Sequence, residues 1–245
     1  MATAHPKRVD LAEAYVLHTV PFRETSLLVD AFTAEHGRLT LAARGARRPS
    51  SALRGVLMPF QRVSLSWFGR GEVRTLHQAE WQSLTPGLSG RALICGFYLN
   101  ELLVRLLPRD DPHPGLFEAY VEALARLPLA EPFDAVLRPF ELRVLAELGY
   151  GIDLEREAGG ETPVAEDRVY RYRLEHGLVP DTASTRGGRE AGVEVSGASL
   201  RAMAVGDYEA ESTRREARRL LRAVLGNYLG DKPLLSRELL APFNE

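Results

Sequence analysis

HGRLTLAARGARRPSSALRGVLMPFQRVSLSWFGRGEVRTL, residues 36–76, is the stretch that decides the fold. From Arg38 to Arg74 it contains eight arginines and a single acidic residue, Glu72. The net charge of the whole chain is only −2, so the basic character is concentrated in this stretch. In RLTLAARG and RVSLSWF the apolar residues alternate with polar ones, which is typical of half-buried strands. The stretch therefore predicts strands that carry a basic surface.

Similar alternation on both sides extends the prediction to a sheet of five strands. The predicted strands are 14–20, 26–33, 38–45, one strand within 56–68, and 72–82. Gly37 supplies the turn between the second and third strands. Residues 43–55 are rich in arginine, glycine, serine and proline, so we expect an exposed loop there. Five short antiparallel strands within residues 1–84 predict an oligonucleotide-binding (OB) fold barrel, with an SH3-like barrel as the alternative.

After residue 84 the period of the apolar residues changes from two to that of a helix. The predicted helices are 91–107, 116–127, about 133–148, 199–205 and 211–229. Pro139 lies inside the third of these, so that helix is expected to kink there or to begin just before it. The glycine-rich residues 151–192 form an insertion in which 169–179 alternate like a short hairpin. The prediction is an α+β protein with a barrel at 1–84 and a mainly helical domain at 85–245.

The composition excludes several classes of protein. The 245 residues include one cysteine, Cys95, which lies in the apolar run ALICGFYL and is expected to be buried and unpaired. No run approaches the roughly 18 apolar residues that cross a bilayer, and the N-terminus has no signal-peptide core. We therefore expect a cytoplasmic protein with no membrane partner. Only two of the 31 basic residues are lysines, a bias that genome composition alone could produce.

Residue patterns for catalysis are missing from the sequence. The six histidines are scattered, and no nucleotide-binding or hydrolase motif occurs. Asp110 and Asp111 form a carboxylate pair, but prolines on either side place them in a turn, where a solvated loop is the simpler interpretation. Glu72 is the only acid within the basic stretch, which disfavours a metal-dependent nuclease. We predict no catalytic residue, no metal and no cofactor.

Arginines and aromatic residues together suit a groove for nucleic acid, because guanidinium groups bind phosphates and rings stack on bases. The alternative is a solvated strand face around an ordinary core. Phe22, Phe60 and Trp67 are also possible stacking residues, although Trp67 shares a face with Val63 and Leu65 and is expected in the core. The predicted DNA-binding residues are Arg38, Arg44, Arg47, Arg48 and Arg54, with Arg70 and Arg74 across the barrel and Phe68 as the preferred stacking residue.

Several longer strings resemble a known family. They are YVLHTVPFRETSLLVDAFTAEHGRLTLAARGAR (15–47), RGEVRTL (70–76), YLNELLVRLL (98–107), FELRVLAELGYG (140–151) and KPLLSREL (232–239). In this order, over nearly the entire chain, they resemble the bacterial RecO family of recombination mediators, particularly its proteobacterial branch. The resemblance implies an OB-fold, a helical C-terminal region and a non-catalytic role in the RecF pathway of DNA repair at the nucleoid. It also implies binding of single- and double-stranded DNA, annealing of complementary strands, contact with the C-terminal tail of the single-stranded-DNA-binding protein (SSB), and loading of RecA together with RecR.

The chain departs from the family in its insertion. Many RecO proteins carry four cysteines there as two C-x-x-C pairs, and the matching stretches are 157–160 and about 180–183. Neither contains a cysteine. A thiolate site for zinc cannot form without these ligands. We therefore predict no zinc, and an insertion that is held by packing or is loose.

An acidic tail with a free carboxylate needs an apolar pocket beside a cation. The segment AVLRPFELRVL, residues 135–145, offers both, and the predicted tail-binding residues are Arg138, Leu142, Arg143 and Leu145. The alternative is that the apolar residues are core between helices.

A second basic set comprises Arg214, Arg215, Arg218, Arg219 and Arg222. Neighbouring glutamates make a solvated helix face the simpler interpretation, and a further DNA or tail contact is the other. For the chain as a whole, a metal-dependent nucleic-acid enzyme and an OB-fold adaptor that binds only protein remain alternatives to a DNA-binding mediator.

Overall fold

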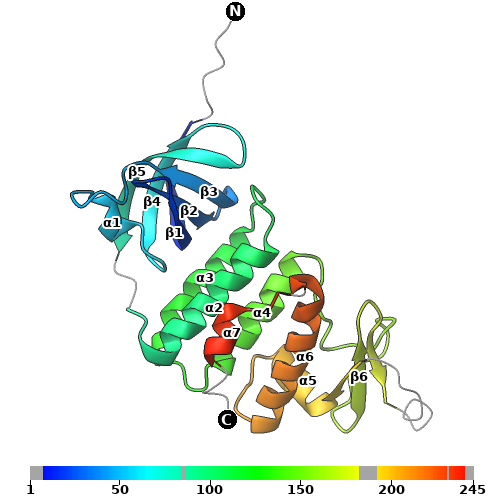
Figure 1. Ribbon diagram of the computed structural model, residues 1–245. Coiled ribbons are helices and arrows are strands. Elements are labelled where there is room, and N and C mark those ends of the chain that lie inside the picture. Colours follow the sequence, from blue (N-terminus) through cyan, green and yellow to red (C-terminus); the bar gives the residue numbers. More distant parts are fainter. Residues whose placement is uncertain (1–7, 84–86, 182–191, 231, 241–245) are drawn as a thin grey trace, which may run out of the picture. The chain divides into compact units, whose positions relative to one another are not determined.

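The computed structural model describes residues 8–83, 87–181, 192–230 and 232–240. A sheet of five strands precedes a mainly helical remainder, so the predicted α+β class is confirmed (Figure 1). The chain forms two compact units: unit 1 comprises Met1–Pro128 and Leu234–Glu245, and unit 2 comprises Leu129–Pro233. The predicted domain boundary at residue 84 lies just after the last barrel strand, which ends at Ser83. The two compact units divide after Pro128. Unit 2 is thus an insertion in unit 1.

The five strands of unit 1 form a closed barrel. They are β1 (Arg8–Phe22), β2 (Ser26–Thr33), β3 (Gly37–Ala43), β4 (Arg62–Phe68) and β5 (Val73–Ser83). Their order is β1-β2-β3-β5-β4, and β4 pairs back on β1. Only the β3–β5 pair is parallel, because the chain crosses from β3 to β4 before β5 returns. This is the Greek-key order of an OB-fold, which confirms that prediction and removes the SH3-like alternative.

Strand β1 is longer than the predicted 14–20 because irregular pairing hides its alternation. The register shifts between Val9 and Ala12 and again between Val16 and His18. At the first shift Leu11 has a positive φ of 52°, and its N–H donates to the Ser66 hydroxyl at 3.0 Å. A bulge inserts a residue into the ladder and so breaks the period of two that sequence patterns rely on.

The barrel core is built as the alternation predicts. Val63, Leu65 and Trp67 all point inward and are buried. The loop predicted between β3 and β4 contains one additional element, the short helix α1 (Leu53–Val56). Its first and last residues pack against the barrel core, so this part of the loop closes one end of the barrel.

Two helices of unit 1 pack on the barrel through a buried polar connection. The helical elements are α2 (Gly90–Leu106), α3 (Pro114–Arg126) and the 3-10 helix η1 (Leu127–Leu129). The Asn100 side-chain N–H donates to the Leu17 carbonyl at 2.7 Å, and the Tyr120 hydroxyl donates to the Asn100 side-chain oxygen at 2.6 Å. Leu17 lies at the second register shift of β1, where the ladder is irregular. Burial raises the pKa of Tyr120 well above its ordinary value, so its hydroxyl stays protonated.

The last described helix, α7 (Leu235–Leu240), returns to α2. The Glu101 carboxylate accepts the N–H groups of Leu235 and Ser236, both at 2.9 Å, and the Ser236 hydroxyl at 2.5 Å. Glu101 therefore satisfies the backbone donors at the start of α7. Cys95 of α2 is buried, as predicted, and is not part of a disulfide.

Unit 2 consists of helices and a small sheet. They are α4 (Asp134–Glu147), β6 (Val169–Arg173), β7 (Gly177–Pro180), β8 (Val193–Ser196), α5 (Gly197–Ala204) and α6 (Glu211–Leu229). The predicted hairpin is β6–β7, and β8 adds a third strand on the other side of β6 that the sequence did not predict. Helix α4 continues through Pro139. No described helix is long and apolar enough to cross a bilayer.

The cysteine-less insertion is held by hydrogen bonds around one buried tyrosine. The Tyr170 hydroxyl accepts the Ala165 N–H at 2.9 Å and donates to the Glu157 carboxylate at 3.2 Å. Arg168 lies 3.7 Å from the same carboxylate. Glu157 is thus paired with protein donors, and residues 151–192 contain no cysteine, so these residues do not fit a zinc site. The second matching stretch, about 180–183, ends in two residues that lie outside the described residues.

Candidate nucleic-acid interface

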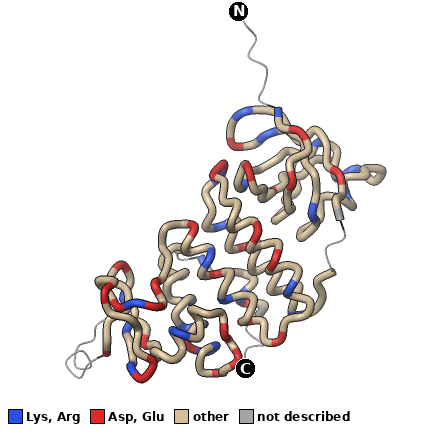
Figure 2. Tube along the Cα trace, turned by 180° about the vertical axis from the view of Figure 1, so that it is seen from behind, with Lys and Arg blue, Asp and Glu red and all other residues tan. Residues whose placement is uncertain are grey.

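The strand directions divide the predicted basic surface between two ends of the barrel. The β3–β4 connection carries four of the predicted arginines and lies beside the β1–β2 turn, where Leu27 pairs with Ala43. The β4–β5 turn, with Arg70, lies at the opposite end, where Arg8 pairs with Phe68. Figure 2 shows the basic positions of the barrel in these separate segments. The sequence places these arginines close together, but the fold separates them.

We call the first group the basic end. It consists of Arg44, Arg47, Arg48 and Arg54, together with Arg23 of the β1–β2 turn. The Arg47 N–H donates to the Thr25 carbonyl at 2.9 Å, and its guanidinium donates to the Arg23 and Glu24 carbonyls at 3.3 and 3.2 Å. Arg47 therefore fixes the loop on the turn while it keeps its charge at the surface.

Three guanidinium groups of the basic end are available. Arg44, Arg48 and Arg54 are exposed, and their side chains make no hydrogen bond or ion pair within the described part of the chain. The backbone beneath two of them is ordered by turn bonds, in which the Arg48 N–H donates to Gly45 and the Arg54 N–H to Ser51. Unpaired charges on a braced loop create a positive potential that attracts polyanions.

An exposed aromatic residue that the sequence analysis missed lies at the same end. Trp81, near the end of β5, is 52% exposed, and its indole N–H donates to the Gln61 side-chain oxygen at 2.6 Å. Helix α1, which carries Arg54, lies against β5. Phe22 is half-buried there, with the Arg23 guanidinium 5.1 Å from its ring centre. Trp81 was missed because a register shift in β5 disguises which face it occupies.

Apart from Phe22, the aromatic residues considered for stacking do not lie exposed at the basic end. Phe60 is buried, with its ring centre 5.0 Å from that of Phe97. Trp67 is only 2% exposed, as its alternation with Val63 and Leu65 predicts. Phe68 is 37% exposed, but it lies at the opposite end from the basic end.

At that opposite end, two predicted DNA-binding arginines hold the α2–α3 loop instead. The Arg38 guanidinium donates twice to the Leu107 carbonyl, at 3.0 and 3.1 Å, and lies 3.7 Å from Asp30. Its burial lowers its pKa. Arg74 forms an ion pair with Asp110 at 2.6 Å. Both guanidinium groups already bind groups of the α2–α3 loop, so we remove Arg38 and Arg74 from the proposed DNA surface.

The β2–β3 turn contacts the same loop closely. Gly37 has a φ of 65°, and a Cβ at this position would lie 2.0 Å from the Asp111 carbonyl oxygen. The Asp110 N–H donates to the Arg38 carbonyl at 2.9 Å. The Asp110–Asp111 turn, predicted to be a solvated loop, is therefore part of a junction. Arg70 remains exposed beside it, on the wall of a hollow of about 330 Å³.

Helix α4 does not present the predicted tail-binding set as one surface. Arg138 is buried, with its guanidinium 3.3 Å from Asp134 and 2.7 Å from the fully buried Glu141. Leu145 is also buried. Arg138 and Leu145 therefore belong to the core of unit 2. Arg143 is exposed and pairs with Glu147 at 2.7 Å, and Leu142 is partly exposed.

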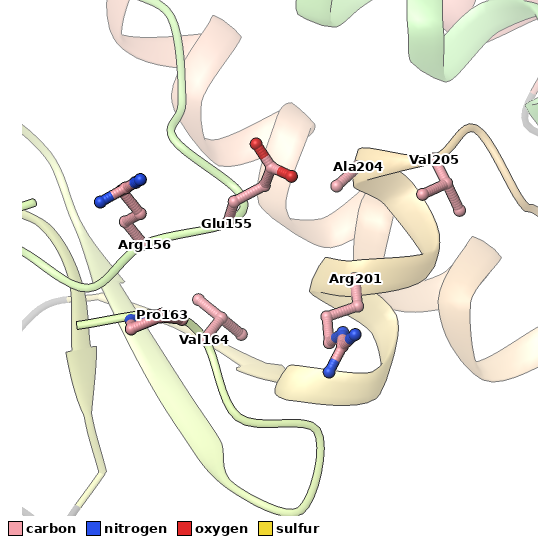
Figure 3. Close-up of a pocket in the computed structure, with 7 residues that line it drawn as sticks. All are labelled: Glu155, Arg156, Pro163, Val164, Arg201, Ala204 and Val205. Carbon is pink, nitrogen blue, oxygen red and sulfur yellow. The ribbon is translucent and has the colours of Figure 1, made fainter. Parts of the chain in front are cut away.

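A hollow of unit 2 beside helix α5 has no convergent charges. Its volume is about 360 Å³, and it lies between the insertion and helix α5. Arg156 and Arg201 lie on different sides of it, and their guanidinium groups do not point toward each other (Figure 3). Glu155 is the acid on its wall, so no single ligand charge is favoured there. Among the described residues, no three His, Cys, Asp or Glu side chains gather to hold a metal.

Two family models match consecutive parts of this chain. Residues 10–84 match the family model "Recombination protein O N terminal", and residues 88–238 match "Recombination protein O C terminal". The DNA repair protein RecO of Azoarcus sp. (strain BH72) is 51% identical over 235 residues, which cover 96% of each chain. The proteins of the same name from Nitrosospira multiformis and Aromatoleum aromaticum are 47% and 49% identical, each over 98% of both chains. This chain therefore belongs to the RecO family of DNA repair and recombination proteins.

Proposed function

We propose that the protein binds DNA without catalytic turnover and serves as a recombination mediator of the RecF pathway, acting at the nucleoid. In this role it binds single- and double-stranded DNA, anneals complementary strands, engages the SSB tail and, with RecR, helps to load RecA. The observation that carries the proposal is the basic end of the barrel. There, three unpaired guanidinium groups lie at the same end of an OB-fold as an exposed tryptophan.

The chemistry of the basic end suits a strand of any sequence. Guanidinium groups bind phosphates as planar forks, and an exposed indole stacks on any base. Neither contact reads base edges, so binding is largely independent of sequence. Each phosphate that is neutralised releases counterions, so affinity falls steeply as salt is added.

The test removes charge from the basic end without disturbing its structure. Arg44, Arg48 and Arg54 are replaced together by glutamine, while Arg47 is kept because it braces the loop. Binding of a fluorescent oligothymidylate of about 30 nucleotides is measured across a salt series. Loss of three contacts lowers the slope of log affinity against log salt by about 2. An unchanged slope would remove the basic end from the DNA site.

The matched control replaces Arg126, Arg156 and Arg201, three exposed arginines that are not part of the basic end, by glutamine. It removes the same charge, so equal loss in both variants would indicate only a general charge effect. A parallel incubation of DNA with the protein and magnesium separates this proposal from a nucleic-acid enzyme, because an enzyme would release fragments.

For the SSB tail, the accessible part of the predicted set is Leu142 with Arg143. A tail that ends in an apolar residue and a free carboxylate would place these groups beside Leu142 and Arg143, respectively. Replacement of Arg143 by glutamate is expected to weaken binding of an isolated tail peptide and to spare oligothymidylate binding. Arg126→Glu, at another exposed helix position, is the control, and equal peptide affinity in both variants would contradict this placement.

A further inference from the structure

Helix α6 carries a stripe of arginines that the barrel-centred function does not use. Arg215, Arg218, Arg219 and Arg222 follow one another at helical spacings of three, one and three residues, which puts them on one face. With Ala223 they line an open hollow of about 330 Å³. We call these four residues the α6 stripe. Unlike the hollow in Figure 3, its charged groups all have the same sign.

The opposite face of α6 fixes the orientation of the stripe. Ala217, Leu220, Leu221, Val224 and Leu225 are buried, and they hold the helix in unit 2. Arg214 is next to the stripe in sequence but has a structural role at the start of the helix. Its guanidinium donates to the Tyr208 and Glu209 carbonyls and to the Glu211 carboxylate. The stripe is therefore displayed on a fixed helix rather than on a loop.

Within the stripe, two arginines make hydrogen bonds or ion pairs, and the other two make neither with a described residue. Arg218 lies 3.2 Å from Asp134 and 3.3 Å from Glu211. The Arg219 guanidinium donates to the Glu194 carbonyl, and its charge also acts on the Glu216 carboxylate, whose pKa it helps to lower. Arg215 and Arg222 are exposed, and their side chains make no hydrogen bond or ion pair with any described residue. The partnered pair thus braces the stripe, and the outer pair is left to bind.

The spacing of the outer pair suits a phosphate backbone. Seven residues of helix separate Arg215 from Arg222, which is a rise of about 10 Å. One strand of a duplex presents a phosphate about every 3.4 Å along its axis, so the stripe spans about three phosphates. Among the residues that the structure describes, no aromatic or large apolar side chain lines the hollow. An acidic peptide with an apolar end would find no pocket there, whereas phosphates need only the guanidinium forks.

We propose that the α6 stripe is a second binding surface for the phosphate backbone of a nucleic-acid strand, in addition to the basic end. This inference rests on the proposed function and adds a site in unit 2 to the site in unit 1. A chain with two such surfaces can hold two strands at once, which is what annealing requires. Because the stripe has no stacking residue, it contacts the backbone and leaves the bases free to pair.

The test replaces Arg215 and Arg222 by glutamine in the full chain. Both are exposed and unpaired, so the fold is expected to be unchanged, and circular dichroism and the urea midpoint check this. The probes are the fluorescent oligothymidylate and a pair of complementary oligonucleotides. Loss of two contacts lowers the salt slope by about 1.4 and slows annealing. The matched control is Arg156→Gln with Arg201→Gln, the two exposed arginines of Figure 3, which removes the same charge from the same unit.

The outcomes separate this inference from the proposed function. Suppose that the basic-end variant has a smaller slope of log affinity against log salt and that the α6 variant behaves like its control. The stripe proposal is then wrong, and the proposed function stands. If neither variant changes binding, both fall. If the α6 variant loses affinity for a labelled acidic peptide with an apolar C-terminal residue but not for DNA, the stripe is a protein-binding surface and the proposal is overturned.

Discussion

Arg74 and Asp110 form an ion pair at 2.6 Å that joins strand β5 to the α2–α3 loop. The contact explains why an arginine in the most basic stretch of the chain is unavailable for DNA. It lies beside the Arg38–Leu107 hydrogen bonds, so the two contacts attach one end of the barrel to the helices of unit 1.

A double-mutant cycle tests this role of Arg74. The Arg74 side chain is mostly buried and Asp110 is partly exposed, so the coupling energy between them should be about 0.5–1 kcal/mol. Arg74→Ala, Asp110→Ala and the double variant are compared by urea unfolding, and oligothymidylate affinity should match that of the unmodified chain. A drop in affinity as large as that of the basic-end variant would return Arg74 to the DNA site.

The two tryptophans give a spectroscopic test of the stacking surface. Trp67 is buried and Trp81 is exposed at the basic end, so a base that stacks on the protein should quench only Trp81. Addition of oligothymidylate is expected to quench the intrinsic fluorescence, and Trp81→Phe should abolish the quenching with little loss of affinity. Trp81→Ala should weaken binding by about 1–3 kcal/mol. Full quenching in Trp81→Phe would exclude this residue.

Arg138 should behave as a structural residue. Its removal would leave the fully buried Glu141 carboxylate without its cation at 2.7 Å, which should cost about 3–5 kcal/mol of unfolding free energy. Arg138→Met is therefore expected to lower the urea midpoint strongly, and Arg138→Met with Glu141→Gln to recover part of the loss. If Arg138→Met kept its stability and lost only peptide binding, the ion pair would not be structural.

The lowered pKa of Glu216 leads us to expect that the stability of unit 2 depends on pH. Burial alone would raise its pKa, but hydrogen bonds from the Ser196 N–H and hydroxyl, both at 2.9 Å, bring the pKa below its ordinary value of 4.5. A lowered folded-state pKa stabilises the protein above the unfolded-state pKa, and this stability is lost as the pH falls through the folded-state pKa. The stability difference between the unmodified chain and Glu216→Gln should therefore shrink below about pH 4.5.

Urea unfolding at several pH values measures that difference. Glu161→Gln, at an exposed position of the insertion, corrects for the loss of one negative charge. A difference for Glu216→Gln that stays constant from neutral to acidic pH would contradict the linkage.

Local patterns predicted the parts of the fold that depend on neighbours in sequence. Strand β2 has the predicted bounds, and Val63, Leu65 and Trp67 face inward, because alternation alone sets both. The partners of Arg38 and Arg74 come from the α2–α3 loop, which no pattern within the basic stretch could reveal. These two arginines therefore look like surface residues in the sequence.

The burial of Arg138 did leave a signal in the sequence. Its partners lie four residues before it and three residues after it, at Asp134 and Glu141, on the same face of one helix. Such spacing lets a charged residue enter a core with its counter-ions. The neighbouring leucines favour a tail-binding cation, whereas these two acids favour a buried ion pair, which the structure has.

The insertion of unit 2 between Pro128 and Leu234 has a mechanical consequence. If one nucleic-acid strand were bound to the barrel and another to α6, a force between them would be carried by two chain connections. These connections follow Pro128 and precede Leu234. The second connection depends on the packing of α7 in unit 1, where Glu101 accepts the first backbone N–H groups of the helix. Proteolytic loss of the residues from Leu234 onward would leave unit 2 attached by a single hinge.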